Sequence, residues 1–228
     1  MMDIKLHFEV LGDGMPLVML HGNGEDHWYF AGQMETFSRH FKLILVDTRG
    51  HGKSPRGDAP FTLEQFADDL KGLLDEQNIT RCYMLGFSDG GNIAMIFALK
   101  YPGYVEKLVL NGANLYYEGL AEWLQNEVSE KWHRFQEWGL DDPDIRREWE
   151  LQDLMMTQPN LRPEQLSGLT MPTLVVAGEE DVIREEHTCL IAESFPNSRL
   201  EILPGDHFVA RRNTEQYNKV VLNFLLEG

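Results

Sequence analysis

The sequence predicts an α/β fold, with a mostly parallel, doubly wound sheet of about seven or eight strands and helices on both of its faces. Short, nearly unbroken apolar runs alternate along the chain with longer stretches of helical spacing. Strands that are covered on both faces of a parallel sheet have this unbroken apolar character, and their alternation with helices is typical of doubly wound folds. A second observation, the absence of any strand pattern over residues 115–166, indicates a helical insertion.

Seven apolar runs are the predicted strands. In chain order they read KLHFEV, LVML, KLILV, CYML, KLVL, TLVVA and RLEIL. The first two are joined only by LGDGMP, which is too short for a parallel crossover. We therefore expect these two strands to pair as an antiparallel hairpin at the N-terminal edge of the sheet.

Two stretches of the core show the clearest helical spacing. Residues 61–77 and 214–226 both carry apolar side chains at i, i+3, i+4 and i+7, which places those side chains along one face of a helix. At the start of the first stretch, Thr62 and Gln65 fit a capping box. Each stretch is therefore predicted to be a helix that packs on the sheet.

Residues 115–166 are predicted to form a helical cap, or lid, inserted into a core domain of residues 1–114 and 167–228. The insertion reads as two or three helices, one of which has Asp142 as its cap and Pro143 as its first residue. Four of the five tryptophans lie in it: Trp123, Trp132, Trp138 and Trp149. Aromatic side chains at helical spacing mostly face a core, so we expect most of these rings to pack the cap onto the domain.

The composition of the chain argues against several classes of binding partner. The net charge of −17 argues against nucleic-acid binding and against anionic membrane surfaces, which leaves a small-molecule substrate as the expected partner. No apolar stretch approaches the ~20 residues that span a bilayer, and the first residues lack a signal-peptide pattern. Cys82 and Cys189 are too few for a disulfide framework. We expect a cytoplasmic protein, and the oligomeric state stays open.

No cofactor or metal is expected from the sequence motifs. The letters GKS at residues 52–54 resemble part of a phosphate-binding loop, but that loop needs a glycine at position 47, which is aspartate here. We also find no G-x-G-x-x-G motif and no His, Cys or Glu spacing that is typical of a metal site.

The segment GFSDG, residues 86–90, joins the strand-like run CYMLGF to the helix-like run that follows. A serine on so sharp a strand-to-helix turn exposes its Oγ above the sheet, and the flanking Gly86 and Gly90 let the strand and the helix approach closely. The helix N-terminus adds free N–H groups and a positive dipole beside the serine. Ser88 is therefore the predicted nucleophile.

A serine nucleophile needs a base and an acid that orients the base. Asp181 follows the run TLVVAGEE, and His207 follows the last predicted strand. The chain order Ser, Asp, His is the one expected for a triad on this architecture. We predict His207 as the base and Asp181 as the acid, with Glu179 and Glu180 as rivals for the acid role.

An oxyanion hole needs a second donor besides the N–H that follows the serine. The run LVML ends in HGNG, a turn whose glycines expose backbone N–H groups. We predict the backbone N–H groups of Asn23 and Asp89 as the two donors. His21 is expected to hold the turn through side-chain hydrogen bonds.

Five segments together resemble the α/β-hydrolase fold superfamily, the serine hydrolases with a G-x-S-x-G nucleophile elbow. LHGNG is similar to the oxyanion turn of that family, VDTRGHGKS to its D-x-R-G-x-G-x-S segment, and GFSDGG to its nucleophile elbow. PTLVVAGEED and PGDHF are similar to its acid and histidine segments. The resemblance covers essentially the whole chain and implies a sheet of eight strands, or about seven where the N-terminal edge is trimmed.

The predicted function is hydrolysis of a small carboxylic ester or lactone through an acyl-enzyme on Ser88. The substrate pocket is expected under the cap, with a lining of Trp28, Phe87, Asn114, Tyr116 and Val182. The resemblance also allows a carbon–carbon bond hydrolase or a cofactor-free lyase with the same triad. From another class, a small-molecule receptor without turnover stays open as an alternative.

Overall fold

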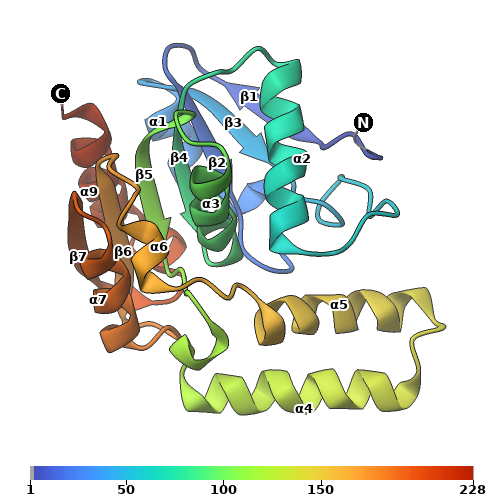
Figure 1. Cartoon of the computed structure of the whole chain (residues 1–228). Coiled ribbons are helices and arrows are strands. Elements are labelled where there is room, and N and C mark those ends of the chain that lie inside the picture. The colour runs from blue at the N-terminus through green and yellow to red at the C-terminus, as the bar shows by residue number, and fades with distance from the viewer. Residues whose placement is uncertain (1–2, 228) are drawn as a thin grey trace.

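A computed structural model describes residues 3–227, and these contain one seven-stranded sheet in the order β1-β3-β2-β4-β5-β6-β7 (Figure 1). The strands are β1 (Phe8–Leu11), β2 (Pro16–Leu20), β3 (Lys42–Val46), β4 (Cys82–Phe87), β5 (Val105–Asn111), β6 (Thr173–Glu180) and β7 (Ser198–Asp206). All neighbouring pairs are parallel except β1 with β3. The predicted fold class is confirmed.

The predicted edge hairpin is half right. An antiparallel strand does close the N-terminal edge, but β1 pairs with β3, from Phe8 opposite Val46 to Leu11 opposite Leu43, and not with β2. Because β3 inserts between them, this strand, which is buried from Leu43 to Val46, has a hydrogen-bonded neighbour on both sides, while the more exposed β1 takes the edge. The short link is compatible with this order, since residues 12–15 span up to roughly 13 Å and strands on either side of a third lie roughly 10 Å apart.

Helices cover both faces of the sheet. One face carries α2 (Leu63–Glu76), α3 (Asp89–Lys100), α6 (Pro163–Leu166) and α7 (Glu185–Ser194). The other carries the 3-10 helix η1 (His27–Phe30) with α1 (Ala31–Phe37), α8 (Val209–Arg212) and α9 (Thr214–Leu226). Over residues 3–227, no helix is both long and apolar enough to cross a bilayer.

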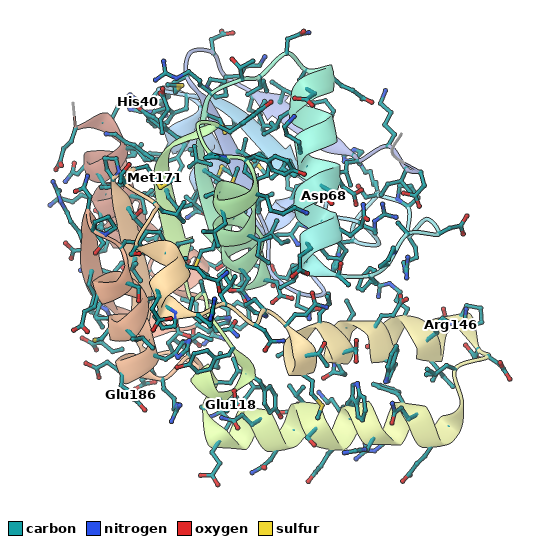
Figure 2. All side chains as sticks on the ribbon, viewed as in Figure 1. His40, Asp68, Glu118, Arg146, Met171 and Glu186 are labelled. Atoms are coloured by element: carbon teal, nitrogen blue, oxygen red, sulfur yellow. The ribbon has the colours of Figure 1, made fainter. Side chains whose placement is uncertain are left out.

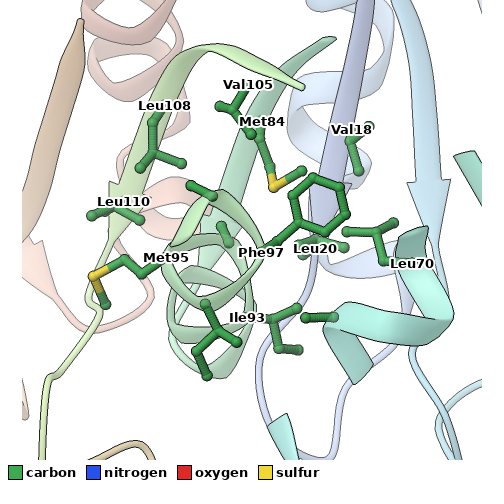
Figure 3. Packing of buried hydrophobic residues seen from close by; sticks show 14 of the residues in the cluster. Val18, Leu20, Leu70, Met84, Ile93, Met95, Phe97, Val105, Leu108 and Leu110 are labelled. Atoms are coloured by element: carbon green, nitrogen blue, oxygen red, sulfur yellow. The ribbon is translucent and has the colours of Figure 1, made fainter. Parts of the chain in front are cut away.

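Alternation along the strands divides the core into two layers. Successive side chains of a strand point to opposite faces, so Val18 and Leu20 of β2 pack with α2 and α3, whereas Leu17 and Met19 pack on the α1 and α9 side. Figure 3 shows part of the first layer, where Leu20, Met84 and Phe97 meet between the sheet and α3. Burial on both faces explains why the strand sequences are unbroken apolar runs.

The helix caps follow the sequence closely, with one correction. Thr62 caps α2, because its side chain accepts the Gln65 backbone N–H at 3.1 Å. The Gln65 side chain, however, donates to Asp69 at 2.9 Å instead of returning to the backbone of Thr62, so only half of the predicted capping box forms. Asp142 caps α5 as predicted and accepts the backbone N–H groups of the next turn.

Most of the stretch 115–166 forms η2 (Tyr117–Gly119) and two antiparallel helices, α4 (Glu122–Trp138) and α5 (Pro143–Thr157), beyond the carboxyl ends of the strands (Figure 1). Its last helix, α6, instead packs on the sheet. Side chains of the two helices meet between them (Figure 2). There, Trp132 donates to Asp153 at 2.9 Å and packs near Trp149. Trp123 and Trp138 are about 60% exposed, so the expected packing of the cap rings does not extend to them.

Helix α5 contacts the core through side-chain hydrogen bonds, and the segment before α4 contacts it through the backbone, where the Ala121 N–H donates to Val182 at 2.8 Å. The Arg56 guanidinium forms two-pronged hydrogen bonds with the Glu150 carboxylate. The Asn23 side chain donates to the backbone oxygen of Leu151 at 2.8 Å. The division of the chain into core and cap domains stays a prediction.

Candidate active site

The strand order places a crevice between β2 and β4. After β3 the chain crosses β2 and continues at β4 on its other side, and ligands of open α/β sheets bind beyond the carboxyl ends of the strands at such a switch point. The turn after β2 carries Asn23, and the turn after β4 carries Ser88. The topology alone therefore brings these two turns together.

Ser88 occupies a strained backbone conformation. It lies between the end of β4 and the start of α3 with φ 52° and ψ −121°, one of two non-glycine residues with positive φ among residues 3–227. Such a conformation costs of order 1–3 kcal/mol and persists only where the surroundings enforce it. Here the Ser88 N–H donates to Asn111 at 2.8 Å, and its carbonyl oxygen accepts from Gly91 and Asn92 at the start of α3.

The glycines around Ser88 permit close approach, as the sequence predicts. A Cβ on Gly86 would lie 2.2 Å from the carbonyl oxygen of Gly90, and a Cβ on Gly90 would lie 2.1 Å from that of Leu20. Both obstacles are backbone atoms, which cannot rotate away. Strand β4, helix α3 and the end of β2 are therefore in direct backbone contact around the serine.

The three predicted triad residues meet in hydrogen-bonding order. Ser88 Oγ lies 3.1 Å from His207 Nε2, and His207 Nδ1 lies 2.6 Å from Asp181 Oδ1. Each residue directly follows a strand, namely β4, β6 and β7. The rivals Glu179 and Glu180 are exposed at the end of β6, whereas the Asp181 side chain is only 2% exposed and accepts the Ile183 N–H. The arrangement can move a proton from the serine hydroxyl to the imidazole.

Gly112 is a residue of this site that the sequence analysis missed. A Cβ there would lie 2.8 Å from His207 Cε1 and 3.4 Å from Asp181 Oδ2, and its φ is 60°. The residue after β5 must therefore be glycine for the imidazole to sit between Ser88 and Asp181. Its position directly after a predicted strand, like that of the other site residues, was the available signal.

The turn after β2 lies against Ser88 and is held by His21, as predicted. A Cβ on Gly22 would approach Ser88 Cβ to 3.1 Å. His21 is buried; its Nδ1 donates to the Gly22 carbonyl oxygen at 2.8 Å and its Nε2 accepts the Thr48 N–H at 3.1 Å. Burial lowers the pKa of His21, so the neutral imidazole that these two bonds require is favoured.

A cavity of about 350 Å³ opens above these side chains. Its wall includes Asn23, Phe87, Ser88, Asp89, Asn114, Val182 and His207, all predicted site residues. It also includes residues not predicted there: Glu25, Leu120, Trp123, Leu124, Glu127, Met155, Ile183 and Phe208. Helices α4 and α5 thus supply part of the wall.

Two of the predicted pocket residues lie elsewhere. Trp28 is 59% exposed and packs against the ring of His27 at 5.2 Å between centroids. Tyr116 packs edge-on against His187 at 4.6 Å. Trp28 lies in η1 and Tyr116 directly precedes η2, next to the site, where nearness in sequence does not fix the direction of a side chain, and the prediction for them is wrong.

Two buried acceptors beside Ser88 have no hydrogen-bond donor among the described residues. They are Asp89 Oδ2 and Asn23 Oδ1. The other oxygen of Asp89 accepts from Asn92 at 3.2 Å, and the Asn23 amide nitrogen donates to Leu151. Burial raises the pKa of the Asp89 carboxyl to about 6, against the weaker effects of Asn92 and His207.

The substitution Asp89→Asn is expected to stabilise the protein at alkaline pH. Because the folded-state pKa lies above the unfolded value, ionisation opposes folding: stability is complete below about pH 4 and is lost as the pH rises through about 6. A shift of this size corresponds to at most about 3 kcal/mol. In urea denaturation, the free energy of unfolding of Asp89→Asn should exceed that of wild type by an amount of that order at pH 8 and by about half of it at pH 5. An equal gain at both values would contradict the burial argument.

The comparisons with known proteins agree with this architecture. A family model described as alpha/beta hydrolase fold matches residues 15–137. The chain is 30% identical to "Serine hydrolase BPHL" of Mus musculus, over 97% of this chain and 83% of the relative. It is 29% identical to "Pimeloyl-[acyl-carrier protein] methyl ester esterase" of Nitrosospira multiformis, over 89% of this chain and 90% of the relative.

A solved structure of a hydrolase from Pseudomonas aeruginosa PA01 superposes with a TM-score of 0.80 at 25% identity, covering 98% of this chain and 95% of that one. The family match covers more than half of the chain, and the likeness to the mouse relative extends over nearly all of it. The chain therefore belongs to the alpha/beta hydrolase fold family.

Proposed function

We propose that the protein is a serine hydrolase that cleaves a small carboxylic ester or lactone through an acyl-enzyme on Ser88. The observation that carries the proposal is the continuous hydrogen-bonded chain from Ser88 Oγ through His207 to Asp181, with distances of 3.1 and 2.6 Å. An unactivated serine hydroxyl is a weak nucleophile, and a hydrogen-bonded, oriented imidazole supplies the base that it lacks.

In the acylation step, His207 Nε2 takes the Ser88 proton as Oγ forms a bond to the acyl carbon. Asp181 fixes the tautomer with the proton on Nδ1 and stabilises the imidazolium that forms. The imidazolium then returns its proton to the departing alkoxide, which leaves as the alcohol; in a lactone that alcohol stays attached to the acyl group. A water molecule, deprotonated by the same imidazole, attacks the acyl carbon and releases the acid and Ser88.

The negative oxygen of the tetrahedral intermediate needs donors. The backbone N–H of Asp89 opens α3 and has no acceptor within the helix, and the turn that contains Asn23 lies against Ser88 through Gly22. We assign the backbone N–H groups of Asn23 and Asp89 to this role. In comparable sites each donor is worth roughly 3–4 kcal/mol of transition-state stabilisation.

The cavity supports a small substrate. Its volume of about 350 Å³ lies at the lower end of the range for small-molecule sites. Apolar side chains such as Phe87, Leu120 and Val182 form much of its wall, which suits an apolar acyl or alcohol group. The methyl ester esterase among the relatives supports ester chemistry at this site.

A panel of p-nitrophenyl esters with increasing acyl length, measured beside simple lactones, tests the proposal. We expect kcat/KM to be highest for short acyl groups and to fall by about tenfold or more once the chain exceeds the cavity. Stoichiometric labelling of Ser88 by a fluorophosphonate should accompany this activity. Labelling with negligible rates on all esters and lactones would favour a carbon–carbon bond hydrolase or a lyase, and folded protein that does not label would favour a receptor.

A further inference from the structure

We propose that His7, His27 and Asp47 form a binding site for a divalent transition-metal cation, with Zn²⁺ as the best chemical match. One ligand atom from each residue lies within 4.8 Å of the others. The three residues are far apart in sequence and meet only through the fold: His7 precedes β1, His27 begins η1, and Asp47 follows β3. This is why sequence spacing, which led us to expect no metal, gave no sign of them.

Asp47 is the centre of the cluster. Its carboxylate is fully buried and accepts the backbone N–H groups of His27 at 2.8 Å and of Lys53 at 2.9 Å. His27 Nδ1 donates a hydrogen bond to Oδ1 at 2.7 Å, and a metal ion would take the place of that proton. His7 Nδ1 lies 3.2 Å from Oδ2. Both imidazoles therefore direct Nδ1 at one carboxylate, and their ring centroids lie 5.5 Å apart.

The contact between His7 and Asp47 is unsatisfied as a hydrogen bond. His7 Nδ1 is buried and has no hydrogen-bond partner among the described residues, although Asp47 Oδ2 is 3.2 Å away. On the other side of the ring, Nε2 lies 3.3 Å from a Glu9 carboxylate oxygen. Neither of these two contacts has the geometry of a hydrogen bond, so the buried Nδ1 faces the Asp47 carboxylate without a partner. A cation between Nδ1 and Oδ2 would give this buried nitrogen the partner that it lacks.

The donor set fits a borderline transition metal. Two imidazole nitrogens and one carboxylate are a common ligand set for Zn²⁺ and leave a fourth position for water. Glu9 would act on His7 as the carboxylates behind metal-bound histidines do, by fixing the tautomer. The His7 side chain is 25% exposed, which gives the ion a path from solvent, while Asp47 and His27 are almost completely buried.

The bound ion would join three segments near the candidate active site. It would tie the edge strand β1 and the end of β3 to η1, which begins soon after the turn that contains Asn23. Because the three ligands come together only in the folded chain, binding stabilises the folded state. The expected consequence is thermal stabilisation, and it does not depend on the proposed hydrolytic activity.

Calorimetric titration of chelator-treated protein with ZnCl₂, together with thermal denaturation, tests the site. We expect one Zn²⁺ per chain and a rise in Tm of about 5 °C or more at 100 times Kd. His7→Ala and His27→Gln should each weaken binding by about 100-fold or more. The exposed His40 and His133, replaced by Ala, are matched controls that should change neither quantity.

Three results would overturn the proposal. The first is no Zn²⁺ binding by folded wild-type protein. The second is binding that survives in both His7→Ala and His27→Gln, which would place the ion elsewhere. The third is a metal-independent, pH-dependent stabilisation that disappears in His7→Ala, which would show that a proton on His7, and not a metal ion, lies between Glu9 and Asp47. Because His7 is partly exposed, we expect His7→Ala to fold, and circular dichroism checks this.

Discussion

Replacing Ser88 with alanine is expected to abolish ester hydrolysis, with kcat falling about 10⁴- to 10⁶-fold. The substitution removes the hydroxyl oxygen that His207 Nε2 contacts at 3.1 Å, so no acyl-enzyme can form. The fold should persist, because the hydrogen bonds that hold this turn come from backbone atoms of Ser88 and its neighbours. Initial rates on the best p-nitrophenyl ester, measured at matched protein concentration, give the comparison.

Ser167→Ala is the matched control, since Ser167 is exposed at the end of α6 and is not part of the cavity wall. It should keep the wild-type rate and the wild-type fluorophosphonate labelling. Ser88→Ala should lose both. Hydrolysis by Ser88→Ala within tenfold of wild type, after contaminating esterases are excluded, would rule out the covalent mechanism.

Gly90→Ala should have the largest effect on stability. The added Cβ would lie 2.1 Å from the Leu20 carbonyl oxygen and 2.6 Å from that of His21. Because both obstacles are backbone atoms at the carboxyl end of β2, relief requires α3 to move off the sheet. We expect the free energy of unfolding to fall by more than about 3 kcal/mol. This is a large share of the roughly 5–15 kcal/mol that stabilises a typical domain.

Gly168→Ala provides the comparison, because a Cβ at Gly168 meets nothing within 4 Å. Chemical denaturation should leave this variant within about 0.5 kcal/mol of wild type, while Gly90→Ala unfolds at much lower denaturant or fails to accumulate as folded protein. If both variants have the same midpoint, the close contact between α3 and β2 is not as tight as described.

The elements of the fold were predictable because burial on both faces leaves a strong local signal. All seven apolar runs became strands, and the two clearest helical stretches became α2 and α9. The partner of β1 was not predictable from the same signal. The order of strands in a sheet is decided by pairing between segments that are distant in sequence. The short link between β1 and β2 is compatible both with a hairpin and with a third strand between them.

The candidate site divides in a similar way. Ser88, Asp181 and His207 could be named because each directly follows a strand, and the carboxyl ends of parallel strands share one edge. Pocket residues were harder to name, since the directions of loop side chains depend on contacts that sequence does not show. Trp28 is therefore mostly exposed, whereas Trp123 and Met155, from the two cap helices, line the cavity without having been predicted there.

The hydrogen bond between the Asn23 side chain and the Leu151 carbonyl has a consequence for selectivity. It joins α5 to the turn whose backbone is proposed to stabilise the intermediate, so a movement of α5 away from the core would break this bond and leave the turn held from the His21 side alone. With this bond broken, the protein would be a poor catalyst for any ester that binds in the cavity. Only a substrate small enough for α5 to keep this bond would then be hydrolysed quickly. A larger ester would be hydrolysed slowly even if it binds.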